Sequence, residues 1–118
     1  MFNFFRKNEQ KTKTSVNQEY IENAFSFLID SGYNYKFYQK NWEKEFIYSL
    51  GECCIEIYLT GSAFDCIVRT KDFSRCNISK SSIASEHFKQ EFTKSNSIKR
   101  IDMTIDLLHE NANIFGLE

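Results

Sequence analysis

Three carboxylates have the residue type and the setting that acid–base chemistry needs. Glu45, Glu56 and Asp65 lie in segments where polar and apolar side chains alternate, so we expect them on one face of a β-sheet. Paired carboxylates work as acid and base when burial separates their pKa values. On an open sheet face water would solvate all three, so we expect no catalytic role for them and no enzymatic activity in the chain.

The four cysteines form no C-x-x-C pair. The strand alternation described below places Cys53 and Cys66 in the core, where a free cysteine behaves as a small apolar residue. Cys54 and Cys76 remain as thiols that could be exposed, and whether either is reactive stays open. Free cysteines of this kind are typical of a reduced, cytoplasmic protein.

Neither the histidines nor the glycines form a binding motif. His87 and His109 fall on separate predicted helices, whereas zinc needs clustered ligands. The four glycines are too widely spaced for a phosphate-binding loop. We therefore expect no metal and no cofactor.

Size, composition and charge indicate one folded domain. The chain has 118 residues, of which 42% are hydrophobic and 16% aromatic, enough to build a core. Residues 1–14 hold four basic residues and one acidic residue, whereas the remainder holds 11 basic and 15 acidic residues. We expect residues 1–15 to be a flexible basic leader and residues 16–118 to be a mildly acidic domain, which argues against nucleic acid as a partner. No apolar run approaches the ~20 residues of a membrane span, so no stable membrane insertion is expected.

A helix is predicted over residues 16–31. Its apolar stripe recurs at helical spacing and consists of Ile21, Ala24, Phe25, Leu28 and Ile29. Ser15 is the predicted N-cap, with Gln18 as its capping-box partner. Gly32 follows the stripe, where a left-handed residue ends many helices.

Four strands are predicted where side chains alternate with a period of two, at residues 33–38, 45–50, 53–60 and 64–69. Gly51-Glu52 and Gly61-Ser62 have the Gly-X sequence of two-residue type II′ hairpin turns, and a four-residue loop is predicted at residues 40–43. With these turns, apolar residues of neighbouring strands pair on one face, as in the row Phe37, Phe46, Ile57 and Cys66.

Two further helices are predicted after an irregular segment at residues 71–78. Their apolar stripes run from Ile83 to Phe92 and from Ile98 to Ala112, and Ser97 is the predicted N-cap of the second. The fold class is therefore α+β. We expect a four-stranded antiparallel meander with an N-terminal helix and two C-terminal helices, in the order α-β-β-β-β-α-α.

The same register predicts the face of the sheet opposite the core. Its rows are Ile47–Glu56–Ile67, Glu45–Tyr58–Asp65 and Ser49–Cys54–Arg69. This face is either an ordinary solvated face or a protein-binding patch with Tyr58 and Arg69 as anchors, and a helix could cover part of it. A second acidic surface is predicted on the last helix, where acidic residues recur every four positions at Asp102, Asp106 and Glu110.

The general plan of residues 16–113 resembles the small immunity proteins of bacterial toxin–immunity systems, which include contact-dependent growth inhibition. The features that carry the resemblance are the Gly-turn meander ECCIEIYLTGSAFDCIVRT, the flanking helices and the lack of an enzyme motif. The resemblance implies a cytoplasmic inhibitor that binds one toxin domain, often a nuclease, and occludes its active site. An acidic body would suit a basic toxin domain.

We therefore expect a protein-binding inhibitor of the immunity type. The alternative is an adaptor or subunit that acts through self-association or partner binding, and a small enzyme with Cys54 or Cys76 as nucleophile comes third. The predicted partner-binding residues are Glu45, Glu56, Tyr58, Asp65, Arg69, Asp102 and Asp106.

Overall fold

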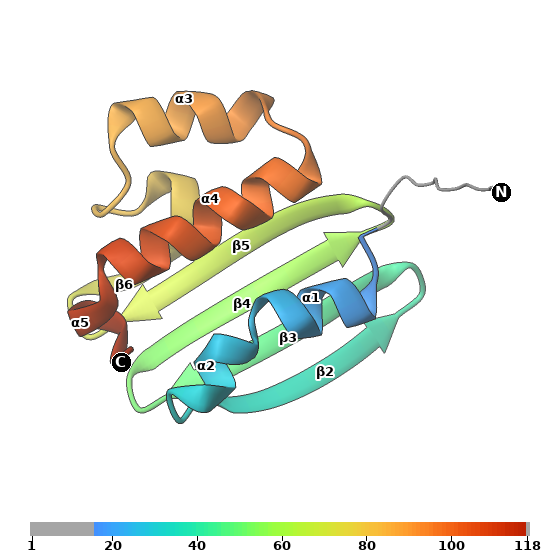
Figure 1. The fold of residues 1–118 in the computed structure, drawn as a ribbon, viewed down its shortest axis with the longest axis horizontal. Helices are drawn as coiled ribbons and strands as arrows, with labels where there is room; N and C mark the ends of the chain where they lie inside the picture. The colour runs from blue at the N-terminus through green and yellow to red at the C-terminus, as the bar shows by residue number, and fades with distance from the viewer. Residues whose placement is uncertain (1–15, 118) are drawn as a thin grey trace, which may run out of the picture.

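An antiparallel sheet with helices on one of its faces makes up the fold (Figure 1). The computed structural model describes residues 16–117, so the leader predicted for residues 1–15 lies outside the described residues. The elements, in chain order, are α1 (Gln18–Ala24), α2 (Ser26–Asp30), β2 (Asn34–Lys40), β3 (Glu43–Leu50), β4 (Cys53–Thr60), β5 (Ala63–Thr70), β6 (Phe73–Asn77), the 3₁₀ helix η1 (Ile78–Lys80), α3 (Glu86–Lys94), α4 (Ser97–Glu110) and α5 (Ala112–Phe115). The predicted α+β class is confirmed.

The sheet has five strands in the order β2-β3-β4-β5-β6, one more than predicted. The additional strand, β6, lies in the segment 71–78 that we expected to be irregular. Its sequence FSRCN has too little apolar alternation to indicate a strand. Backbone pairing with β5 holds it in place, with Ile67 opposite Asn77 and Val68 opposite Cys76. The prediction of four strands is therefore wrong in number, although the antiparallel order of those four is confirmed.

Tight turns with a left-handed first residue connect the central strands. Gly51 and Gly61 have φ values of 59° and 61°, the sign that a type II′ turn requires at its first position. The loop predicted at residues 40–43 is shorter than expected, because only Asn41 and Trp42 separate β2 from β3. Asn41 has a φ of 54°, which asparagine tolerates better than most residues.

The predicted register is confirmed from β2 to β5. On the core face the paired residues form the rows Tyr35–Tyr48–Ile55–Val68 and Phe37–Phe46–Ile57–Cys66. Phe46, Ile57 and Cys66 are completely buried. Burial of each large apolar side chain stabilises the fold by roughly 1.5–3 kcal/mol, so a one-residue slip of any central strand would forfeit several such contributions.

The predicted N-terminal helix is interrupted. Phe25, with φ −105° and ψ 16°, separates α1 from α2. Its ring is fully buried, and its centroid lies 6.3 Å from those of both Tyr48 and Phe64. Short helices derive most of their stability from tertiary packing. Burial of the Phe25 ring therefore stabilises the fold more than an unbroken helix would.

Asparagines cap two helices for which serines were predicted. Asn17 caps α1 by accepting the Tyr20 N–H at 2.9 Å, and the predicted cap Ser15 lies outside the described residues. Asn96, rather than Ser97, caps α4. The Ser97 hydroxyl donates instead to a carbonyl of the β4–β5 turn and accepts the Phe64 N–H, so it anchors the start of α4 to the sheet.

The helices gather on the core face, and α3 stands on the far side of α4 from the sheet (Figure 1). Arg100 on α4 fastens the two helices together. Its guanidinium donates to the carbonyls of Phe92 and Thr93 at the end of α3, at 2.8 and 3.0 Å, and to the Phe64 carbonyl on β5 at 3.0 Å. One side chain thus joins α3, α4 and the sheet.

We expect Gly61→Ala to lower the free energy of unfolding by about 1 kcal/mol, because an alanine Cβ is strained in the left-handed region. The site is otherwise open, with no atom within 4 Å of the added Cβ. Gly61→Asn should cost less, and Ser62→Ala, at the next position of the turn, serves as the control. Urea denaturation measures all three. An unchanged stability of Gly61→Ala would contradict this account of the register.

Candidate protein-binding surfaces

The described helices lie on one side of the sheet, so none of them covers the opposite face (Figure 1). The predicted rows are all present, with Ile47, Glu56 and Ile67 in one and Ser49, Cys54 and Arg69 in another. Glu56 and Tyr58 therefore do not lie beneath a helix: both are half-buried by neighbouring side chains of the sheet itself.

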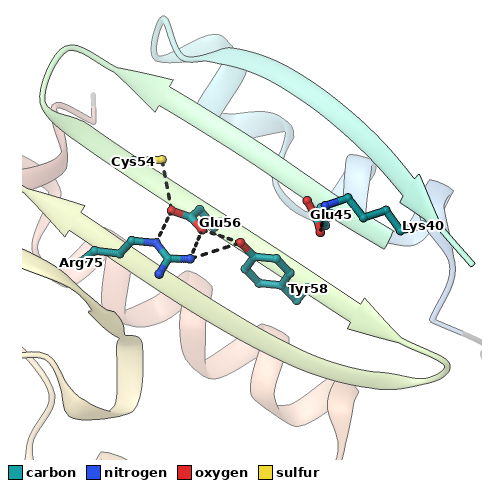
Figure 2. Close-up of polar contacts among 6 residues, drawn as sticks. All are labelled: Lys40, Glu45, Cys54, Glu56, Tyr58 and Arg75. Atoms are coloured by element: carbon teal, nitrogen blue, oxygen red, sulfur yellow. Dashed lines mark hydrogen bonds and ion pairs between the residues drawn. The ribbon is translucent and has the colours of Figure 1, made fainter. Parts of the chain in front are cut away.

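A three-residue cluster occupies the centre of this outer face. Arg75 reaches from β6 across β5 to Glu56 on β4 and binds its carboxylate through two hydrogen bonds of 2.9 and 2.8 Å. The Tyr58 hydroxyl donates to the same carboxylate and accepts from Arg75 (Figure 2). Only 13% of the Glu56 side chain is exposed, so its carboxylate has few contacts with water. The two hydrogen bonds from the planar guanidinium replace those contacts.

The pKa shifts in this cluster follow from its hydrogen bonds and its burial. The hydrogen bonds from Arg75 hold the pKa of Glu56 below its ordinary value and outweigh the opposing effect of burial. Burial and the neighbouring Glu56 raise the pKa of Tyr58 to about 12. Glu56 therefore stays ionised and Tyr58 stays protonated at neutral pH.

The outer face as a whole is not acidic. It carries equal numbers of basic and acidic side chains, namely Lys36, Lys40, Arg69 and Arg75 against Glu43, Glu45, Glu56 and Asp65. Glu45 pairs with Lys40 at 3.3 Å, and Asp65 accepts from Asn77 at 3.0 Å. Sequence reasoning missed the balance because Lys36 and Lys40 were not assigned to this face and Arg75 was not assigned to a strand.

The acidic residues of this face are nevertheless concentrated at one end, next to the β2–β3 and β4–β5 turns. A hollow of about 500 Å³ lies there, and its lining includes Glu43, Glu45, Tyr58 and Asp65 together with the basic residues Arg75 and Arg100. The Gly61 N–H donates to the Trp42 carbonyl at 3.2 Å, which joins the two turns. Arg69 lies in a different row, opposite Cys54, and does not line the hollow.

Two exposed aromatic residues belong to the same end of the sheet, although neither lines the hollow. Trp42 in the β2–β3 turn is 81% exposed, and Tyr38, which pairs with Glu45, is 45% exposed. We call this region the turn-end patch and define it by Tyr38, Trp42, Glu43, Glu45, Tyr58 and Asp65. Sequence reasoning missed both aromatic residues. The signal that could have identified Trp42 is its position in a polar turn, where its side chain is not needed for the hydrophobic core.

The second predicted acidic surface lies on the helical side of the molecule. Asp102, Asp106 and Glu110 are all exposed on α4. Asp106 and Glu110 border a groove of about 350 Å³ between α3 and α4. The predicted partner-binding residues therefore divide between two opposite sides of the sheet, and no one partner surface includes all of them.

The four cysteines are buried or half-buried, whereas both histidines are exposed. Cys54, for which exposure was left open, is buried. Burial and the nearby Glu56 raise the pKa of its thiol, and a raised pKa suppresses the reactive thiolate. Cys53 donates to the Ile114 carbonyl at 3.3 Å. The ring centroid of His109 lies 4.5 Å from that of Phe27, and His87 lies on α3.

Among residues 16–117, no three His, Cys, Asp or Glu side chains come together as ligands for a metal ion. None of the described helices combines the length and the hydropathy needed to cross a bilayer. Comparisons with protein-family models, with curated proteins and with solved structures find no match to this chain.

We expect Arg75→Met to lower the free energy of unfolding by about 1 kcal/mol at pH 7, a value reduced by the solvent exposure of Arg75. A carboxylate whose pKa is lowered in the folded state contributes its full stabilisation to the fold at pH values above its ordinary pKa near 4.5. This contribution is lost as the pH falls through the folded-state pKa. The difference between Arg75→Met and wild type should therefore shrink between pH 7 and pH 3.

Urea denaturation at both pH values checks this expectation. Arg69→Met, which removes the same charge from the same face, is the matched control and should show no comparable loss at either pH. A stability difference for Arg75→Met that is equal at pH 7 and pH 3 would contradict the assigned role of the Glu56 carboxylate.

Proposed function

We propose that this chain works by binding another protein through the turn-end patch. The observation that carries the proposal is the 81% exposure of Trp42, which directly precedes Glu43 in the lining of the hollow. Trp and Tyr dominate the binding energy of protein interfaces because they bury large, rigid, partly polar surfaces. Because the Trp42 indole is exposed to solvent, its surface can be buried by a partner and contribute to the free energy of binding.

The chemistry of the patch favours a partner with basic side chains. Three carboxylates, those of Glu43, Glu45 and Asp65, line the hollow beside Tyr58. The two arginines in the lining are already engaged, Arg75 by Glu56 and Arg100 by backbone carbonyls. A lysine or arginine of the partner would meet carboxylates there and aromatic faces nearby, an arrangement that supports both salt bridges and cation–π contacts. The Glu56–Tyr58–Arg75 cluster would hold the Tyr58 side chain in place beforehand, which reduces the entropy lost on binding.

The specific form of this proposal is an inhibitor of the immunity type. It rests on the resemblance of the meander and its flanking helices to small immunity proteins, together with the acidic, aromatic turn-end patch. In this role the chain would bind one toxin domain, of which a nuclease is the leading example, and occlude its active site.

An adaptor that self-associates is the second candidate, and one observation favours it. Strand β2 lies at the edge of the five-stranded sheet and pairs with β3 in unbroken register over seven residues. An edge of this kind accepts another strand. The exposed lysines Lys36 and Lys40 on the same strand oppose such pairing, so we rank it below the turn-end patch.

The test is co-expression with the toxin domain encoded next to the gene for this chain, followed by calorimetric titration of the purified pair. We expect wild type to restore growth and to bind the domain as a 1:1 complex. Trp42→Ala should weaken binding by roughly 30-fold, corresponding to about 2 kcal/mol, without lowering the melting temperature. Ile29→Ala, which truncates an exposed apolar residue on α2, is the matched control and should bind as wild type does.

Two outcomes would contradict the proposal. Binding by Trp42→Ala that equals wild type would remove the turn-end patch from the interface. A chain that sediments as a dimer through β2 and neither binds the domain nor restores growth would favour the adaptor instead.

A further inference from the structure

The groove between α3 and α4 is a second surface with the character of a binding site, separate from the turn-end patch. The two helices are joined by Ser95 and Asn96 and diverge from that connection (Figure 1). Near this connection Arg100 ties α4 to α3, because it donates to the last carbonyls of α3 and lies 4.9 Å from the centroid of the Phe92 ring.

The groove has an apolar lining and an acidic border. Its apolar residues are Ile83, Phe88, Met103 and Leu107, its acidic residues are Glu91, Asp106 and Glu110, and Lys99 and His87 also line it. Glu91 pairs with Lys94 at 3.3 Å, so Asp106 and Glu110 carry the negative charge of the border. Phe88 and Leu107 are still 9% and 6% exposed, and Ile83 and Met103 are half-buried. Unlike the fully buried residues beneath α4, these side chains keep surface that a partner could cover.

The acidic residues on α4 are placed where they do not help the helix. Asp102, Asp106 and Glu110 stand four residues apart, and like charges at this spacing destabilise a helix by roughly 0.2–0.5 kcal/mol per pair. Asp106 and Glu110 also lie in the C-terminal half of α4, towards the negative end of its dipole. Within residues 16–117, Asp106 and Glu110 make no ion pair.

This arrangement identifies the chemistry of the occupant. A second copy of the chain in a symmetric dimer would bring the two acidic borders together, and an anionic nucleic acid or membrane surface would also be repelled. A cationic segment with an apolar face satisfies both the lining and the border. We infer that the α3–α4 groove docks a basic amphipathic helix of a protein partner, in the helix-in-groove mode.

The inference is tested with a synthetic 14-residue peptide that has leucine at positions i, i+3, i+4 and i+7 and lysine elsewhere, and with a scrambled peptide of the same composition. The full chain, labelled with ¹⁵N, is titrated with each peptide at low salt. We expect chemical-shift changes confined to α3, α4 and their connection, and weaker binding of the scrambled peptide.

The double variant Asp106→Asn/Glu110→Gln should raise the Kd of the amphipathic peptide at least tenfold. The matched control, Glu52→Gln/Asp72→Asn, removes the same charge from two exposed turn residues and should change the Kd less than twofold. Shift changes on the outer face of the sheet, equal binding of the scrambled peptide, or equal loss in the control variant would each overturn the inference, as would a dimer of the free chain that buries this groove.

A stability measurement on the same variants separates binding from a structural role. Because Asp106 and Glu110 oppose each other and the helix dipole, Asp106→Asn/Glu110→Gln should raise the melting temperature of the free chain by ~2–4 °C. A melting temperature below that of wild type would mean that these carboxylates serve the fold, and the inference would fail.

Discussion

The pairing register of the sheet is the constraint on which the rest of the molecule depends. Side chains alternate along a strand, so one choice of register decides which residues reach the core and which reach the outer face. Gly51 and Gly61 enforce that choice with left-handed turns, and Asn41 does the same between β2 and β3. The buried rows around Phe46 and Ile57 then stabilise the register that the turns specify. Both candidate surfaces follow from it, since the turn-end patch lies on one side of the sheet and α4 packs on the other.

The features that could be predicted from the sequence are those determined by residues close together along the chain. Gly-X turns and period-two alternation are enough to identify the register of β2 to β5, and with it the row Glu45–Tyr58–Asp65. Apolar stripes identify the helical segments in the same way. In each case the signal lies within a few neighbouring residues, and turn chemistry agrees with hydrophobic pattern.

The features that sequence reasoning missed are those that tertiary contacts decide. Strand β6 forms because its backbone meets the edge of β5, which its polar side chains do not reveal. Arg75 was therefore not assigned to the outer face. Glu56 was expected to be a solvated carboxylate, whereas it is hydrogen-bonded by both Arg75 and Tyr58. The break at Phe25 has the same origin, because the packing of one ring against partners far along the chain overrides the preference of the local sequence.

Trp42 gives the most direct measurement of the central claim, because it is the one tryptophan of the chain. Its fluorescence therefore reports on the turn-end patch without labels or substitutions. In the free chain we expect the emission of a hydrated indole, readily quenched by acrylamide, and at saturation with the partner domain a blue shift and protection from the quencher. Emission that is already that of a buried indole in the free chain, or that stays unchanged at saturation, would contradict the account.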